Sequence, residues 1–284
     1  MSILSKASKD DFDSPVERLL ASIANLVQQP TSKGAHFYRT SLRRFQAWSD
    51  VFHPETDSKQ NQALRFLDKL RKATGKLRDS EVHRELLQKV ATDQAVEKRK
   101  LDKALKARRD RYERKLRNRL REPILTGIWS MLRSLDESPQ GKEVRPTFHP
   151  IDGMITLALD EYRAFVQRHG KISPENLHPY RLQCKRFRYT AELAGDSPEV
   201  NALVETWKGV QDIIGEWHDY LTLTDLAQDV LGDSTVVTAL QELTRQKFTD
   251  SISAIATVEN KLIRQTVPRK QPRRASAGGR SRAA

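Results

Sequence analysis

Hydrophobic residues recur every three or four positions along almost the whole chain, which is the period of an amphipathic α-helix. Prolines and small hydroxyl residues mark where these segments begin and end; Pro15 opens the first and Pro30 closes it. The pattern predicts helices over residues 15–29, 32–52, 58–91, 94–121, 124–136, 151–169, 178–195, 198–231 and 234–264. No segment alternates between apolar and polar residues as a half-buried strand would. The predicted fold class is therefore all-α.

The proline-containing residues 138–150 interrupt the helical pattern and predict a linker between two halves, residues 13–137 and 151–265. Residues 1–12 and 266–284 are predicted to be disordered. The C-terminal tail is rich in Pro, Ser, Gly and Ala, and from residue 264 onward it carries seven Lys and Arg residues without an acid.

Two short motifs occur once in each half. Residues 36–45 read HFYRTSLRRF and residues 178–187 read HPYRLQCKRF. Further on, GKLRD at 75–79 matches GEWHD at 215–219, in the same order and at nearly the same offset. An internal repeat of this kind predicts two related helical halves of about 120 residues each.

In a helix, the cationic residues of each copy fall on one stripe and the large apolar residues on another. The cationic stripes hold His36, Arg39 and Arg43 in the first copy and His178, Arg181, Lys185 and Arg188 in the second. The apolar stripes hold Tyr38, Leu42 and Phe45 in the first copy and Tyr180, Cys184 and Phe187 in the second. Arg44 and Arg186 lie at the edges of the cationic stripes. Pro179 suits the first helical position, which predicts His178 at the helix cap.

Like charges one helical turn apart repel each other, so a cationic stripe without acidic partners favours an anionic ligand. Neither of the stretches around the motif, residues 19–49 and 176–191, contains an acid. The forked guanidinium of arginine suits phosphate oxygens, and helix N-termini also attract anions. A solvated helix face is the alternative interpretation of each stripe, and a structural hydrogen bond is the alternative for each histidine.

The chain has 284 residues with 50 Lys and Arg against 37 Asp and Glu, and this net charge of +13 favours polyanionic partners. Residues 97–121 hold 13 of the cations and four acids, which fits a binding surface and a solvated helix equally well. The single cysteine, Cys184, excludes an intrachain disulfide, and no apolar run is long enough to span a membrane, so we expect a cytoplasmic protein. The tryptophans are expected in the core rather than against bases: Trp48, Trp129, Trp207 and Trp217.

His218 and Asp219 permit another interpretation, the centre of a metal-dependent phosphohydrolase with His178 as a further ligand. The repeat argues against it, because the first half has Arg78 and Asp79 at the matching positions and arginine has no lone pair for a metal. Each aspartate is expected instead to orient a neighbouring cation or to cap a helix.

The segments HFYRTSLRRFQAW, LRKATGKLRDSEV, LHPYRLQCKRFRYTAEL and LVETWKGVQDIIGEWHDYLTL resemble the two halves of the conserved-histidine α-helical domain, the CHAD family, over residues 13–265. The resemblance implies two bundles of about four helices each, related by a pseudo-two-fold axis around a basic central groove that binds inorganic polyphosphate. The phosphate contacts that it implies are His36, Arg39, Arg43, Arg44, Arg71, Arg78, His178, Arg181, Lys185, Arg186, Arg188 and Lys208. Gln211 departs from the family pattern, which has a basic residue there, and His218 departs from Arg78 of the first half.

We therefore expect a polyphosphate-binding protein rather than an enzyme, associated with polyphosphate granules and without a cofactor, metal or membrane partner. A metal-dependent phosphohydrolase and a nucleic-acid-binding protein are the alternatives. The acidic ExExK signature of the triphosphate-hydrolysing tunnel domain that is fused to some relatives does not occur in the sequence. The basic tail keeps nucleic acid open as a partner, although the body lacks a recognisable reader motif.

Overall fold

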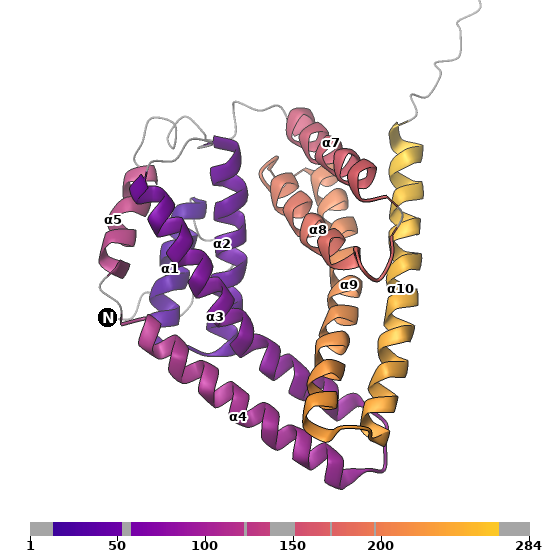
Figure 1. Cartoon of the computed structure of the whole chain (residues 1–284). Helices are drawn as coiled ribbons and strands as arrows, with labels where there is room; N and C mark the ends of the chain where they lie inside the picture. The colour runs from indigo at the N-terminus through magenta and orange to yellow at the C-terminus, as the bar shows by residue number, and fades with distance from the viewer. Residues whose placement is uncertain are drawn as a thin grey trace, which may run out of the picture.

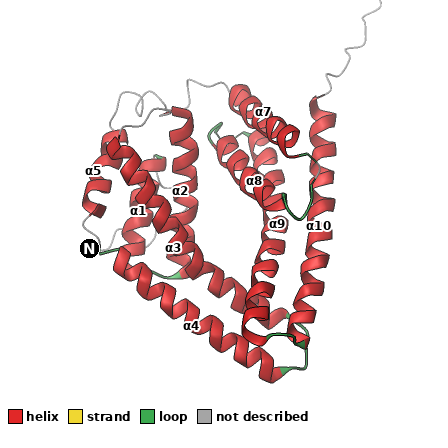
Figure 2. Ribbon diagram, viewed as in Figure 1, coloured by secondary structure: helices red, strands yellow, loops and turns green. Residues whose placement is uncertain are grey.

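A computed structural model of the chain describes residues 14–52, 58–121, 124–136, 151–170, 172–195 and 197–266. Within these ranges the chain forms nine α-helices and no strand (Figures 1 and 2), so the all-α prediction is confirmed. The helices are α1 (Pro15–Gln28), α2 (Ser32–Phe52), α3 (Ser58–Lys89), α4 (Ala95–Arg119), α5 (Ile124–Asp136), α7 (Ile151–His169), α8 (Leu177–Glu192), α9 (Pro198–Leu231) and α10 (Thr235–Thr266). The predicted linker and both predicted disordered tails lie outside the described residues, apart from Thr266. None of the described helices is long and apolar enough to cross a membrane.

Four of the described helices start at hydroxyl caps that the sequence signals: α1 at Ser14, α2 at Thr31, α9 at Ser197 and α10 at Ser234. Ser14 accepts a hydrogen bond from the backbone N–H of Glu17 at 3.0 Å, directly before Pro15. The start of α8 differs from the prediction, because the helix begins at Leu177 and places His178 inside the first turn. Leu177 is fully buried in the core of the second half, and this burial draws the residue before His178 into the helix.

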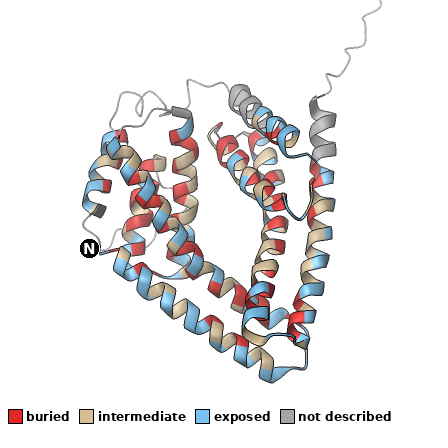
Figure 3. Cartoon of the chain, viewed as in Figure 1, coloured by how far each residue is buried: buried red, intermediate tan, exposed pale blue. Residues whose placement is uncertain are grey.

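The apolar stripes of both motif copies form the cores of the two halves, as predicted. Each of the six stripe residues is at most 1% exposed: Tyr38, Leu42, Phe45, Tyr180, Cys184 and Phe187. Around them, Figure 3 shows buried positions facing neighbouring helices and exposed positions facing outward. Three of the four tryptophans are buried as predicted, and Trp129 packs against the first core while partly buried.

A third core joins the two halves. Helices α3 and α4 continue beyond the first core and meet the adjoining ends of α9 and α10 (Figure 1). The shared core is built from both sides: Leu86, Leu87, Val90, Leu101 and Leu105 with Tyr220, Leu223, Leu226, Ala227, Val236, Val237 and Leu240. The motif helices α2 and α8 also contact each other. The described helices number five in the first half and four in the second, so two pseudo-symmetric four-helix bundles stay a prediction.

The shared core should make the chain unfold as one unit. Leu87 is fully buried there, and Leu87→Ala should lower the free energy of unfolding by about 2–5 kcal/mol through lost burial and a cavity. Urea denaturation followed by circular dichroism measures this loss. The control Leu182→Ala removes an exposed leucine and should change stability by less than about 0.5 kcal/mol. Two separate transitions in the wild type would contradict the shared core.

Candidate anion-binding site

Arg39 extends from α2 to α3 and lies over Gly75. Its Nη1 donates a hydrogen bond to the backbone carbonyl of Arg71 at 2.9 Å, and a Cβ atom on Gly75 would lie only 2.5 Å from that nitrogen. The missing side chain of Gly75 therefore makes room for the guanidinium. Desolvation lowers the pKa of Arg39 to about 10, and the negative charge of Asp79, one turn after Gly75, opposes this shift. The Gly-x-x-x-Asp motif of α3 thus positions Arg39.

Arg181 occupies the matching place between α8 and α9. A Cβ atom on Gly215 would lie 3.8 Å from its Nε and Nη2 atoms, an ordinary contact distance, so this fit is looser. The Nε atom is buried and has no hydrogen-bond partner among the described residues. Desolvation lowers the pKa of Arg181, while the charges of Asp219 and Asp79 oppose the shift. A buried donor without a partner costs about 1–3 kcal/mol, which favours a ligand that accepts its hydrogen bond.

Six cations from the two halves come together around these arginines, and we call them the cation cluster. The cluster consists of Arg39, Arg43, Arg71, Arg78, Arg181 and Lys185. Its members act on each other across the boundary between the halves: desolvation lowers the pKa of Arg43, and the charges of Arg71 and Arg181 lower it further. The two cationic stripes therefore face each other, α2 and α3 contributing from one half and α8 from the other.

Lys185 has the largest change in proton affinity within the cation cluster. Desolvation and the neighbouring charge of Arg181 lower its pKa from 10.5 to about 6. The charges of Arg43 and Arg39 lower it further, and Asp219 opposes them. Most empty molecules at pH 7 therefore hold a neutral amine at Lys185, among guanidinium groups that repel a further positive charge.

Three carboxylates accompany the cation cluster. Asp68 forms the one ion pair within it that the described residues show, at 2.6 Å from Arg71. Desolvation raises the pKa of Asp79 and of Asp219, and the charge of Arg181 opposes both shifts. The two aspartates also repel each other, since the charge of Asp79 raises the pKa of Asp219. Three carboxylates do not balance the five guanidinium groups of the cluster, even with Lys185 neutral, so the site favours an additional anion.

The histidines of the motif lie beside the cation cluster. The rings of His178 and His218 are 4.8 Å apart between centroids. Desolvation, assisted by the charge of Arg181, lowers the pKa of both, for His218 to about 4. Both imidazoles are therefore neutral at pH 7 in the empty protein. In the first half, His36 is exposed on α2, one turn before Arg39.

Four other residues of the implied phosphate contacts are held by acids outside the cation cluster. Arg44 reaches across the halves to Glu192, Nε to Oε2, at 2.6 Å, and the same carboxylate lies 3.3 Å from Arg188 Nε. Arg186 lies 3.3 Å from Glu161 on α7 and 3.9 Å from Asp50 on α2. Lys208 is exposed and pairs with Glu205 at 3.3 Å. These ion pairs give the four cations structural partners.

The sequence did not single out His83, which links the halves beside the site. Its Nε2 lies 2.9 Å from Thr222 Oγ1, across the contact of α3 with α9. The sequence feature that could have pointed to His83 is its position on α3, one turn after Asp79 of the repeated motif. In the described part of the chain, no group of three His, Cys, Asp or Glu side chains could hold a metal ion.

The fold and the paired motifs define an all-helical protein in which cations from two halves face one another. The CHAD domain model matches residues 12–228, and the chain belongs to the CHAD domain family. Among solved structures it is similar to PptA from Streptomyces chartreusis, with 14% identity, a TM-score of 0.61, and 87% of this chain and 96% of that chain covered. The CHAD domain from the plant Ricinus communis is 17% identical, with a TM-score of 0.58 and coverage of 85% and 86%. A search of curated proteins found no match.

Gly75 and Gly209 form a matched pair for testing how Arg39 is positioned. Gly75→Ala should displace the guanidinium, break its bond to the Arg71 carbonyl and weaken polyanion binding about fivefold, the effect of one well-placed hydrogen bond. Gly209→Ala meets no atom within 4 Å and should leave binding unchanged while stabilising α9 by about 1 kcal/mol. Titration calorimetry with polyphosphate and thermal unfolding measure the two effects. Equal binding by both variants would show that Arg39 needs no such space.

Proposed function

We propose that this protein binds inorganic polyphosphate and that the cation cluster is its binding site. The observation that carries the proposal is the meeting of six cations from both halves with too few carboxylates to balance them. Arginine offers paired donors in a plane, which suits the oxygens of phosphate groups. Some members of the CHAD domain family bind polyphosphate, which supports this choice of anion.

A linear polyanion fits this arrangement better than a small one. Arg39 and Arg43 come from α2, whereas Arg181 and Lys185 come from α8, so one ligand that touches both pairs must extend from one half to the other. Contacts made to a second half after the first has bound gain from a high effective concentration. We propose a cytoplasmic protein that associates with polyphosphate granules.

The proposed role includes no catalytic step. A metal-dependent phosphohydrolase would release inorganic phosphate from polyphosphate when a divalent metal is supplied, and we expect no release above the protein-free rate.

A nucleic-acid-binding protein would release bound polyphosphate when RNA or DNA is added at an equal concentration of charge. We expect nucleic acid to compete poorly, because the tyrosines beside the cation cluster in the described part of the chain, Tyr38 and Tyr189, are buried and cannot stack on a base.

The first test removes two cations from one half at a time. Arg39→Gln with Arg43→Gln, or Arg181→Gln with Lys185→Gln, should each weaken binding of long polyphosphate about 100-fold, through loss of two charge-assisted hydrogen bonds. Binding of tripolyphosphate should fall mainly with one of the two pairs. The slope of log affinity against log salt should be about −4 for six contacts in the wild type and should decrease in both variants. Titration calorimetry at several salt concentrations measures these effects.

A control variant with the same change of charge is Arg163→Gln with Arg245→Gln. Both arginines are exposed and pair with an acid on their own helix, and their loss should change affinity about twofold at most. Circular dichroism should show unchanged helix content in every variant, and removing mutually repelling cations should keep or raise the melting temperature. If one cluster variant binds long chains like the wild type, the site does not extend across both halves.

The second test uses the pKa of Lys185. Bound phosphate would raise this pKa from about 6, so binding should take up a proton. Affinity for long chains is then greatest below pH 6 and falls as the pH rises toward the pKa of the bound state, by at most about tenfold per pH unit. Calorimetry in buffers of different ionisation enthalpy measures the uptake directly.

Lys185→Arg keeps the positive charge and removes this titration. In the variant, the affinity between pH 6 and pH 8 should become nearly independent of pH, while binding at pH 6 stays close to that of the wild type. Protonation of His218 affects a lower range, because its pKa is about 4 in the empty protein. The same pH dependence in the variant as in the wild type would refute the role of Lys185.

A further inference from the structure

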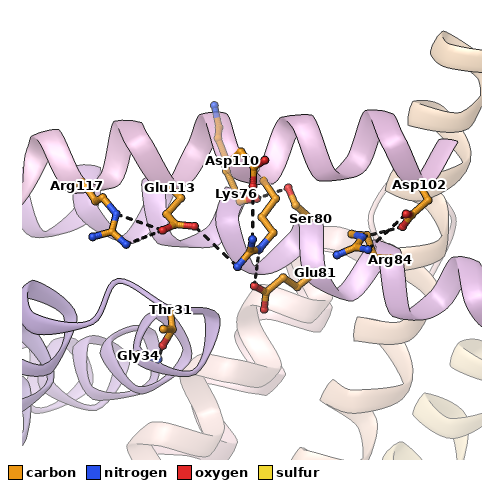
Figure 4. Close-up of polar contacts among 11 residues, drawn as sticks. Thr31, Gly34, Lys76, Ser80, Glu81, Arg84, Asp102, Asp110, Glu113 and Arg117 are labelled. Atoms are coloured by element: carbon orange, nitrogen blue, oxygen red, sulfur yellow. Dashed lines mark hydrogen bonds and ion pairs between the residues drawn. The ribbon is translucent and has the colours of Figure 1, made fainter. Parts of the chain in front are cut away.

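All four acids of α4 are already paired (Figure 4): Glu97 and Asp102 contact other helices, and Asp110 and Glu113 pair along α4 itself. Asp102 pairs with Arg84 of α3 at 2.7 Å, and Arg109 of α4 pairs with Glu81 of α3 at 2.9 Å. Glu113 pairs with Arg117 at 2.7 Å along α4 itself. Glu97 accepts a hydrogen bond from the backbone N–H of Val236, in the first turn of α10. Many cations of α4 remain exposed beyond these pairs.

Most of these exposed cations fall into two groups around the axis of α4, with Lys100 between them. At about 100° per residue, one group lies along the edge of the helix and the other, about 130° away, lies on its outer face. We call the first group, together with a lysine of α3, the edge band: Lys76, Arg108, Arg111 and Lys115. The outer group consists of Arg99, Lys103, Lys106 and Arg114. No member of either group forms an ion pair with a described residue.

The edge band and the cation cluster use the same stretch of α3, since Lys76 lies between the cluster residues Arg71 and Arg78 in the sequence. Lys76 follows Gly75, the residue over which Arg39 lies, and its Nζ is 5.7 Å from the centre of the Tyr112 ring of α4. The guanidinium of Arg108 lies 6.0 Å from the centre of the same ring and donates to its hydroxyl at 3.3 Å. Exposed cations of α3 and α4 therefore meet around one tyrosine.

A second link runs through His83. Desolvation lowers the pKa of His83 to about 4, and the charge of Arg108 lowers it further. The charge of His83 in turn acts on His218, beside the cation cluster, after desolvation and the nearer charges of Arg181, His178 and Lys185. Both histidines are neutral at pH 7, so the groups between the edge of α4 and the cation cluster here form a polar contact, His83 with Thr222, and add no positive charge.

We propose that the edge band is a second phosphate subsite, which holds the part of a long polyphosphate chain that extends beyond the cation cluster. This inference rests on the proposed function. Arg108, Arg111 and Lys115 span about 10 Å along the helix at intervals of about 4–6 Å, so several successive phosphates can contact them. The subsite makes affinity depend on chain length, because a chain that fits within the cluster does not reach α4.

The experiment compares two quadruple variants that remove equal charge. The edge variant carries Lys76→Gln, Arg108→Gln, Arg111→Gln and Lys115→Gln, and the outer-face control carries Arg99→Gln, Lys103→Gln, Lys106→Gln and Arg114→Gln. The edge variant should bind chains of about 100 phosphates at least tenfold more weakly than the wild type, and the control about twofold more weakly. With four contacts from the edge band added to six from the cation cluster, the wild-type salt slope for long chains should be about −7. The edge variant should return it to the value of about −4 that the cluster alone gives, and the control should change it by less than about 1. Tripolyphosphate binding should be unchanged in both.

The possible outcomes separate this inference from the proposed function. If the two quadruple variants lost equal affinity for long polyphosphate, the subsite would be overturned. The effect of α4 would then be a nonspecific attraction by its positive charge. Long-chain binding that is unaffected in the edge variant but lost in the cluster variants would overturn the subsite and retain the proposed function. A wild type that binds neither chain would overturn both. Arg111→Gln with Lys115→Gln keeps the Tyr112 contacts, and it should reproduce about half of the change in slope if the quadruple variant loses helix content.

Discussion

Repulsion among the six cations of the cation cluster is the constraint on which the rest of the structure depends. The cations lie among others of the same sign, and desolvation and repulsion by their neighbours lower the pKa values of four of them: Arg39, Arg43, Arg181 and Lys185. The apolar faces of α2 and α8 hold the charges together, because Tyr38, Phe45, Tyr180 and Phe187 are buried on the opposite side of the same helices. The shared core of α3, α4, α9 and α10 then prevents the halves from separating.

The two halves hold their central arginines differently. Arg39 is fixed by the backbone carbonyl of Arg71 and by the space over Gly75. Arg181 has more room over Gly215, and its buried Nε has no partner among the described residues. The first half therefore presents an arginine that is already oriented, whereas the second presents one whose hydrogen bonding is incomplete without a ligand. The two copies of the motif thus differ in how much a bound anion would change the hydrogen bonding of their central arginine.

The periodicity of the sequence was sufficient to predict the helices and the buried stripes, because amphipathic period and proline breaks are local signals. The repeat also identified the residues of the two cationic stripes, on α2 and α8, that face each other in the structure. It could not show which motif cations are held in ion pairs between helices, because the acids lie on other elements: Arg44 meets Glu192 on α8 and Arg186 meets Glu161 on α7. The start of α8 was misplaced because the burial of Leu177 is a tertiary effect.

The formal charge of the motif also overstates the charge of the empty site. Burial and the charge of Arg181 lower the pKa of Lys185 to about 6, so one of the six positive charges that the sequence suggests is largely absent at pH 7 until an anion restores it. A monovalent ion offsets the repulsion at one point and restores little of this charge. A linear polyanion of the proposed kind would extend along the whole cluster, lower the potential at Lys185 and so restore its positive charge. A neutral amine at Lys185 would therefore favour ligands with many charges over ligands with one, beyond what the five arginines alone would give.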